Sequence, residues 1–91
     1  MKKCDRDVMN EQGFRILKVT KEELEIATDQ ECCFCDSCMK TPEYGYYVAV
    51  LNCWLCPQCF NRWLNNAIRY PEDTEVEERN YQRYRTLLGW Y

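Results

Sequence analysis

The chain has 91 residues, of which 46% are hydrophobic and 30% are charged, and its formal net charge at pH 7 is −3. This composition is that of a folded globular protein, and it excludes the low hydrophobicity and high net charge of a disordered chain. A chain of this length builds one small core, so we expect a single domain over residues 1–91 that needs an additional source of stability. No run approaches the roughly 18 apolar residues of a membrane helix, and no apolar segment follows the charged start. We therefore expect a cytoplasmic protein with no membrane partner.

Eight cysteines and the absence of histidine are the most informative features of the composition. So many cysteines indicate either disulfides in an exported protein or a metal site in a reducing compartment, and the lack of a signal peptide favours the metal site. Without histidine, the chain can form no zinc site with imidazole ligands and has no imidazole general base. It also has no glycine-rich phosphate loop. We expect no enzyme activity.

Two short elements are predicted before the cysteine-rich region. Residues 14–19 are apolar and partly β-branched, which is typical of a strand. Thr20 and Glu23 have the spacing of a capping box, in which each side chain accepts a bond from the other's backbone, and this predicts a helix over residues 21–27. We expect the terminal residues 1–12 to be poorly ordered.

A β-hairpin and a helix are predicted in the middle of the chain. The hairpin turns at residues 51–52, after an alternating strand and before a short return strand over residues 53–55. Beyond it, apolar residues follow the i, i+3, i+4, i+7, i+8 pattern of one helix face, which predicts a helix that extends from residue 60 to residue 69. The residues of this face are Phe60, Trp63, Leu64, Ala67 and Ile68.

A last helix is predicted over residues 74–88. Thr74 and Glu77 repeat the capping-box spacing, and Gly89 can end the helix. Its inner face is expected to consist of Tyr81, Tyr84 and Leu88.

Four of the cysteines form two C-x2-C pairs separated by seventeen residues, as in a four-cysteine zinc site. Each short spacer can aim two sulfurs at one ion, and two pairs complete a tetrahedron with no open position, which makes the zinc structural. The expected ligands of this single Zn²⁺ are Cys35, Cys38, Cys56 and Cys59.

The ligand register has an alternative, because the pattern C-x2-C-x2-C occurs twice. The inner register would use Cys32 and Cys53 in place of two outer cysteines, but it puts bulky residues into the spacers. We favour the outer register because Asp36 and Ser37 are small turn-forming residues. Cys4 then lies in the poorly ordered terminus, and Cys32, Cys33 and Cys53 are packing residues near the site, with a second metal or a redox role as the alternative.

The order of these parts, a C-x2-C turn, a hairpin and a second C-x2-C that leads into a helix, resembles the treble-clef zinc finger over about residues 35–69. The resemblance implies an α+β fold in which a knuckle, a hairpin and a helix hold the zinc, with the N-terminal strand and helix and the C-terminal helix packed on this finger. It implies no single function, since treble clefs serve adaptors, ribosomal proteins, nucleic-acid binders and nucleases. Where a glycine commonly follows the second knuckle cysteine, this chain has Met39 and Lys40.

An iron–sulfur cluster is the competing metal assignment. A bacterial ferredoxin run continues with a further cysteine followed by proline, and neither triplet here does so. Zinc is therefore the favoured ion, and an iron–sulfur or thiol redox protein is the second alternative function.

Two functional classes remain for a non-enzymatic zinc protein. The first is a protein-interaction or adaptor module that acts as a monomer or weak oligomer, which aromatic residues in excess of a small core's needs would support. The alternative for these rings is that they pack the last helix. They are Tyr44, Tyr46, Tyr47, Tyr70, Tyr81, Tyr84, Trp90 and Tyr91.

The second class is a nucleic-acid-binding zinc finger that uses the helix over residues 60–69, whose outer face would carry Arg62, Asn65, Asn66 and Arg69. Charge opposes it, because a sequence pI near 4.9 falls further once four thiolates and one divalent cation are included. We therefore expect the partner to be another protein.

Overall fold

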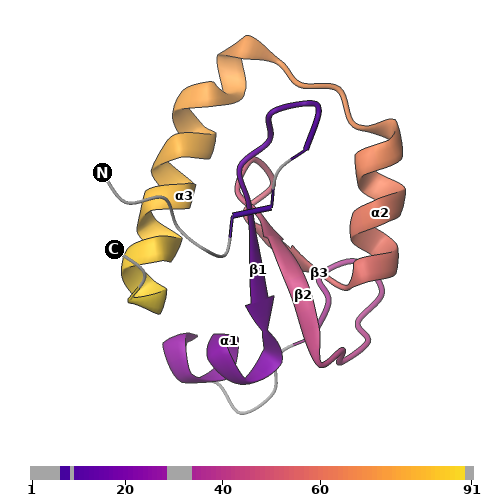
Figure 1. The fold of residues 1–91 in the computed structure, drawn as a ribbon, viewed down its shortest axis with the longest axis vertical. Helices are drawn as coiled ribbons and strands as arrows, with labels where there is room; N and C mark the ends of the chain where they lie inside the picture. The colour runs from indigo at the N-terminus through magenta and orange to yellow at the C-terminus, as the bar shows by residue number, and fades with distance from the viewer. Residues whose placement is uncertain (1–6, 9, 29–33, 90–91) are drawn as a thin grey trace.

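The structure is a computed structural model that describes residues 7–8, 10–28 and 34–89. Within these ranges, three strands form one antiparallel sheet in the order β1-β2-β3, and three α-helices and one 3₁₀ turn surround it (Figure 1). The fold is therefore a small α+β arrangement, as expected. The elements are β1 (Ile16–Thr20), α1 (Lys21–Thr28), β2 (Tyr44–Val48), β3 (Cys53–Leu55), α2 (Pro57–Asn66), η1 (Pro71–Asp73) and α3 (Thr74–Leu88).

The N-terminal strand and helix form as local sequence predicts. The capping box is present in both directions: the backbone N–H of Glu23 donates to Thr20 Oγ1 at 3.1 Å, and the N–H of Thr20 donates to Glu23 Oε1 at 3.0 Å. These bonds satisfy N–H groups that the first turn of α1 would otherwise leave free. Leu24 is 5% exposed and packs α1 against the sheet.

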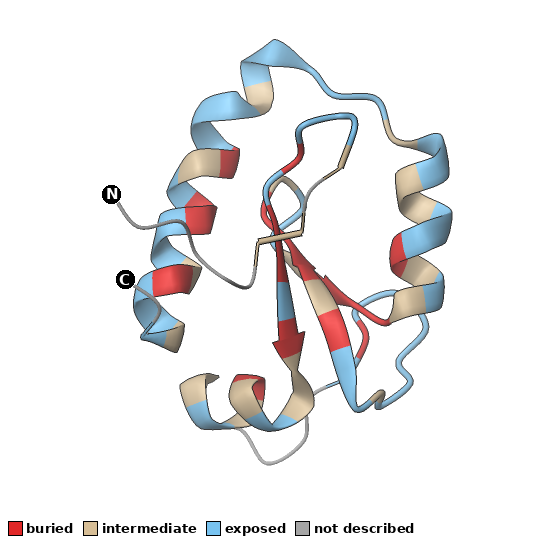
Figure 2. Cartoon of the chain, viewed as in Figure 1, coloured by how far each residue is buried: buried red, intermediate tan, exposed pale blue. Residues whose placement is uncertain are grey.

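Both faces of the sheet are buried, and each face has its own apolar cluster. On one face, Tyr47 of β2 and Leu17 of β1 pack with Tyr81 of α3. On the other face, Val48 of β2 packs with Phe60 of α2. Helices α3 and α2 lie on opposite sides of the sheet, and their buried residues point inward (Figure 2). The α2 face is the one that carries the cysteines.

The middle helix is shorter than predicted. α2 ends at Asn66, and the expectation that it extends to residue 69 is wrong. Asparagine side chains compete with the helical backbone, and Asn66 Nδ2 donates to the carbonyl of Arg62 at 3.0 Å. The apolar stripe ends early as well, since Ile68 is 70% exposed.

The C-terminal helix has the predicted bounds, but its N-terminal cap differs from the predicted one. Thr74 does not cap α3, because the helix follows directly on η1 and its N-cap residue is Asp73, which makes no side-chain capping bond. Glu77 is 3% exposed and is occupied elsewhere: it pairs with Arg69 at 2.7 Å and accepts a bond from the N–H of Arg15 at 3.1 Å. Tertiary contacts have thus overridden the local capping pattern. At its other end, α3 stops at Gly89 in the left-handed conformation, as expected.

Segments outside the sheet cover parts of its two outer strands. The N–H of Val8 donates to the carbonyl of Ile16, and Asp7 bridges Leu17 on β1. On β3, the N–H of Trp54 donates to the carboxylate of Asp36. Poor order of residues 1–12 as a whole stays a prediction. Over the ranges that the structure describes, no helix is long and apolar enough to cross a membrane.

Candidate metal centre

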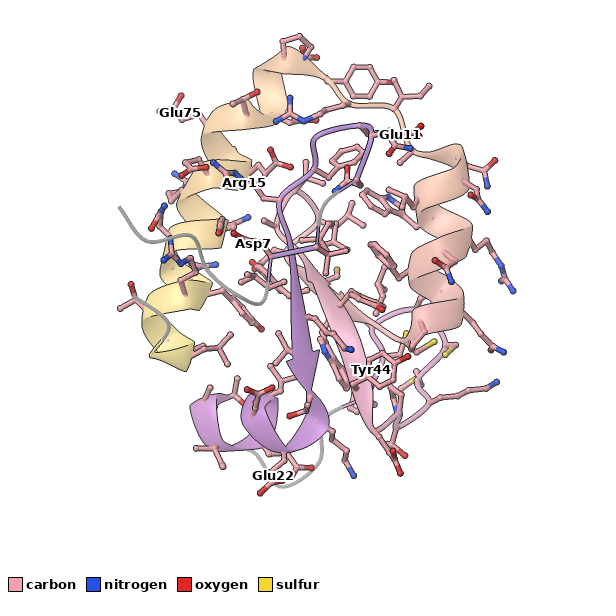
Figure 3. All side chains as sticks on the ribbon, in the orientation of Figure 1. Asp7, Glu11, Arg15, Glu22, Tyr44 and Glu75 are labelled. Atoms are coloured by element: carbon pink, nitrogen blue, oxygen red, sulfur yellow. The ribbon has the colours of Figure 1, made fainter. Side chains whose placement is uncertain are left out.

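Four cysteine sulfurs meet where the loop before β2 approaches the start of α2. The Sγ atoms of the four residues all lie within 4.8 Å of one another. Figure 3 shows these sulfurs gathered beside the first turn of α2. The members of this group, which we call the cysteine tetrad, are Cys35, Cys38, Cys56 and Cys59.

The first pair lies on a tight turn over residues 35–40. The N–H of Met39 donates to the carbonyl of Cys35 at 2.9 Å, and the N–H of Cys35 donates to the carbonyl of Lys40 at 2.8 Å. The N–H of Ser37 points at Cys35 Sγ at 3.4 Å, which favours a thiolate there. This turn therefore aims two sulfurs to one side, as the short spacer predicts.

Met39 has the left-handed backbone conformation, with φ of 65°. This residue directly follows Cys38, where the resemblance to a treble clef leads one to expect a glycine. A left-handed residue other than glycine is strained by about 1–2 kcal/mol. The sequence departs from the usual residue, but the backbone keeps the conformation that glycine would adopt. The Met39 side chain itself is 69% exposed.

Asp36 fastens this turn to the sheet, a role that sequence reasoning missed. Its N–H donates to the carbonyl of Trp54 at 3.0 Å, and its carboxylate accepts from the N–H of Trp54 at 2.8 Å. From the sequence, Asp36 is predicted only to form the turn. Its position in the spacer gives no indication of its bonds to Trp54, eighteen residues away.

The second pair lies at the start of α2. Cys56 is the N-cap residue, Pro57 occupies the first turn, and Cys59 follows within it. Both cysteines therefore lie at the positive end of the helix dipole. β3 ends at Leu55, so the sheet directly positions Cys56.

The geometry of the tetrad fits a tetrahedral ion. Four sulfurs at about 2.3 Å from zinc are separated by about 3.8 Å along each edge of the tetrahedron. The Sγ atoms of Cys38 and Cys56 are 3.6 Å apart, and the longest separation in the tetrad is within 4.8 Å. A small contraction around an ion would complete the site. A tetrahedral set of four sulfurs suits Zn²⁺ or iron.

The thiols differ in their proton affinity. Burial raises the pKa of Cys35, but hydrogen bonds from the backbone of Cys38, Cys56 and Ser37 outweigh it and lower that pKa to about 6. The pKa of Cys59 is raised to about 12, first by its hydrogen bond with the Cys56 thiol and then by burial. The Cys59 thiol thus shares its proton with a neighbouring sulfur, and a bound cation would displace that proton.

The remaining cysteines lie elsewhere or outside the description. Cys53, a ligand in the inner register, belongs to β3, and its thiol donates to the carbonyl of Leu51 at 3.3 Å. It is not part of the tetrad. Burial first, and then the charges of Asp36 and Cys35, raise the pKa of Cys53, which disfavours its thiolate. Cys4, Cys32 and Cys33 lie outside the described residues.

The expected nucleic-acid face does not form as predicted. Arg69 lies beyond α2 and its guanidinium pairs with the buried Glu77, so it is not part of the helix surface. Arg62, Asn65 and Asn66 remain exposed on α2. The helical face that this alternative uses is therefore shorter than predicted and lacks Arg69, and nucleic-acid binding itself stays a prediction.

Of the aromatic residues considered for an interface, six lie in the part of the chain that the structure describes, and four of the six pack in the core: Tyr46, Tyr47, Tyr81 and Tyr84. Tyr47 is fully buried and stacks on Tyr84 with ring centroids 3.5 Å apart, and Tyr81 is 2% exposed. Tyr44 and Tyr70 are exposed, while Trp90 and Tyr91 lie outside the described residues.

The chain matches no protein-family model, no curated protein and no solved structure.

Proposed function

We propose that the cysteine tetrad binds one structural Zn²⁺ in a treble-clef arrangement, and that the chain is a non-enzymatic protein-interaction module. The observation that carries the proposal is the approach of the four Sγ atoms to within 4.8 Å of one another. The parts around the tetrad support the treble-clef assignment: a turn with two cysteines, the hairpin of β2 and β3, and a helix that begins at the second pair.

A structural role for the ion follows from the donor set. Four thiolates fill the tetrahedral positions of Zn²⁺ and leave none for a substrate or water. Structural zinc contributes about 10–16 kcal/mol in finger peptides, which is comparable with the entire net stability of a small domain at about 5–15 kcal/mol. The ion would therefore decide whether the α2 face of the sheet folds.

The proposed interaction function is supported by apolar side chains that the fold leaves in water. Ile68 is 70% exposed, Met39 69% and Tyr70 50%. Exposed apolar and aromatic residues of this kind supply most of the energy of protein interfaces. Four thiolates would fill the positions of the proposed ion, so the tetrad itself would offer none to a substrate, which favours binding over catalysis.

Metal analysis on protein purified without added metal tests the zinc proposal. We expect one zinc and no stoichiometric iron per chain, and a strong chelator should abolish the native circular-dichroism spectrum. Cys56→Ser should lose the metal, whereas Cys53→Ser is the matched control and should keep it, because its sulfur lies outside the tetrad. An unchanged spectrum and melting point after complete chelation would refute a structural ion.

The same variants test the interaction function. Zinc-loaded wild-type protein and Cys53→Ser should capture the same proteins from a lysate of the source cells, and Cys56→Ser should capture none of them. Equal capture by unfolded Cys56→Ser would show that the binding does not depend on the folded surface, and would contradict the proposal.

A further inference from the structure

The segment between α2 and α3, residues 67–70, is extended but belongs to none of the three strands of the sheet. Its backbone is extended, with ψ of 140° at Ala67 and φ, ψ of −106°, 132° at Tyr70. Ile68 and Tyr70 are exposed, whereas the guanidinium of Arg69 between them pairs with Glu77, which is 3% exposed. The segment thus leaves Ile68 and Tyr70 in solvent, while Arg69, although also exposed, is anchored to Glu77 of α3.

The backbone of this segment has unused hydrogen-bonding groups. The N–H of Ala67 donates to Leu64, and the carbonyl of Tyr70 accepts from Asp73. Among the residues that the structure describes, the N–H groups of residues 68, 69 and 70 donate to no protein acceptor, and the carbonyls of residues 68 and 69 accept from no protein donor. Such groups are the template to which an added strand pairs.

Contacts on both sides hold the segment in this form. Glu77 binds Arg69 at 2.7 Å and the N–H of Arg15 at 3.1 Å, which ties the segment to the start of β1. Gln12 Nε2 donates to the carbonyl of Leu64 at 3.3 Å, next to its other end. A strand that is already extended loses less conformational entropy when a partner binds.

The charges around the segment favour a basic partner. Glu11 lies on the turn that carries Gln12, and Glu72 and Glu75 follow the segment directly; all three are exposed. Figure 3 shows Glu11 and Glu75 at the same end of the molecule. The exposed cations near this group in the sequence are Arg62 on α2 and Arg79, four residues after Glu75 on α3, and the charge of Arg69 is paired with that of Glu77. Complementary charge would steer a basic chain to this end and orient it.

We propose that residues 67–70 bind an extended, basic peptide segment of another protein as an added β-strand. The backbone groups of residues 68–70 supply the hydrogen bonds, Ile68 and Tyr70 contact alternate apolar side chains, and the acidic residues pair with lysines or arginines between them. This inference rests on the proposed interaction function and names its surface and the class of its partner.

The probe for this site is a blocked five-residue peptide of alternating lysine and valine, added to zinc-loaded, ¹⁵N-labelled protein. We expect its largest amide shifts at residues 68–70, slower hydrogen exchange there, and an affinity that falls as salt is added. A peptide of alternating glutamate and valine is the charge control, and it should bind at least about tenfold more weakly.

The double variant Ile68→Ser/Tyr70→Ser removes the apolar contacts without changing a buried residue. It should weaken binding of the lysine–valine peptide at least about tenfold. Ile26→Ser is the matched control, because Ile26 is 76% exposed but lies on α1. It should bind like the wild type.

Three results would overturn the docking site: no amide shifts at residues 68–70, equal binding by the double variant, or a concentration-dependent dimer of the chain that pairs through this segment. The metal content and native spectrum are recorded on the same sample. Zinc-loaded, folded protein that fails to bind the peptide contradicts this inference alone, whereas loss of the zinc site or of all captured partners contradicts the proposed function.

Discussion

Replacing Gly45 by alanine tests how the sheet positions the metal centre. Gly45 lies on β2 opposite β3, and a Cβ atom there would be 2.6 Å from the carbonyl oxygen of Leu55 and 2.7 Å from the indole of Trp54. Neither neighbour can move easily, because the first is backbone and the indole is buried with its N–H bonded to the carbonyl of Val19 at 3.1 Å. Alanine must therefore displace β3 or the ring.

The expected loss of stability follows from these contacts. Overpacking a closely packed site costs about 1–3 kcal/mol, and loss of the buried indole bond adds about 1 kcal/mol. Gly45→Ala should therefore lower the free energy of unfolding by about 2–4 kcal/mol, a large part of the stability of a small domain. Because Leu55 directly precedes Cys56, the shift of β3 should also weaken zinc binding.

Urea unfolding of zinc-loaded protein and competition with a coloured chelator measure the two effects. Gly89→Ala is the control, because a Cβ atom there meets nothing within 4 Å, so the substitution costs only the backbone strain of a φ of +76°. It should lose about 1–2 kcal/mol and keep the wild-type zinc affinity. If Gly45→Ala stays within about 0.5 kcal/mol of the wild type, the packing argument is wrong.

Two further predictions concern Met39 and Tyr47. Met39→Gly should stabilise the zinc-loaded protein by up to about 1 kcal/mol in urea unfolding, because it relieves a φ of 65°, and Met39→Ala should not; equal midpoints for the two variants would argue against strain. Burial, and then the neighbouring Tyr84, raise the pKa of Tyr47, so the fold favours the neutral phenol. Its contribution to stability is complete below the unfolded pKa of about 10 and is lost as pH rises further. The urea concentration at the unfolding midpoint should decrease as the pH is raised from about 9 to about 11, and it should decrease less in Tyr47→Phe. An identical pH dependence in the two proteins would contradict this assignment.

Sequence reasoning succeeded where a few neighbouring residues determine the structure. The Thr20 and Glu23 capping box forms because both partners lie within one turn. The preference for Asp36 and Ser37 as spacer residues led to the four cysteines whose sulfurs meet. The capping-box partners, and the two cysteines within each pair, are three positions apart, so their spacing carries the necessary information.

It failed where distant residues compete for the same group. Thr74 and Glu77 have the spacing of the first capping box, but Arg69 and the N–H of Arg15 bind the Glu77 carboxylate. An apolar stripe cannot show where Asn66 ends a helix, or that Ile68 is exposed. Such choices depend on the tertiary arrangement, which no local pattern contains.

The paired bonds between Asp36 and Trp54 also protect the protein from self-association. They occupy backbone groups on the outer side of β3, where an uncovered strand could pair with another molecule and begin aggregation. Asp36 lies between two residues of the tetrad, so the proposed ion would also keep this cover in place. Loss of the metal would expose unpaired backbone groups along the edge of β3, together with the apolar face under α2. Precipitation, rather than a soluble unfolded chain, is then the expected fate of the metal-depleted protein at high concentration.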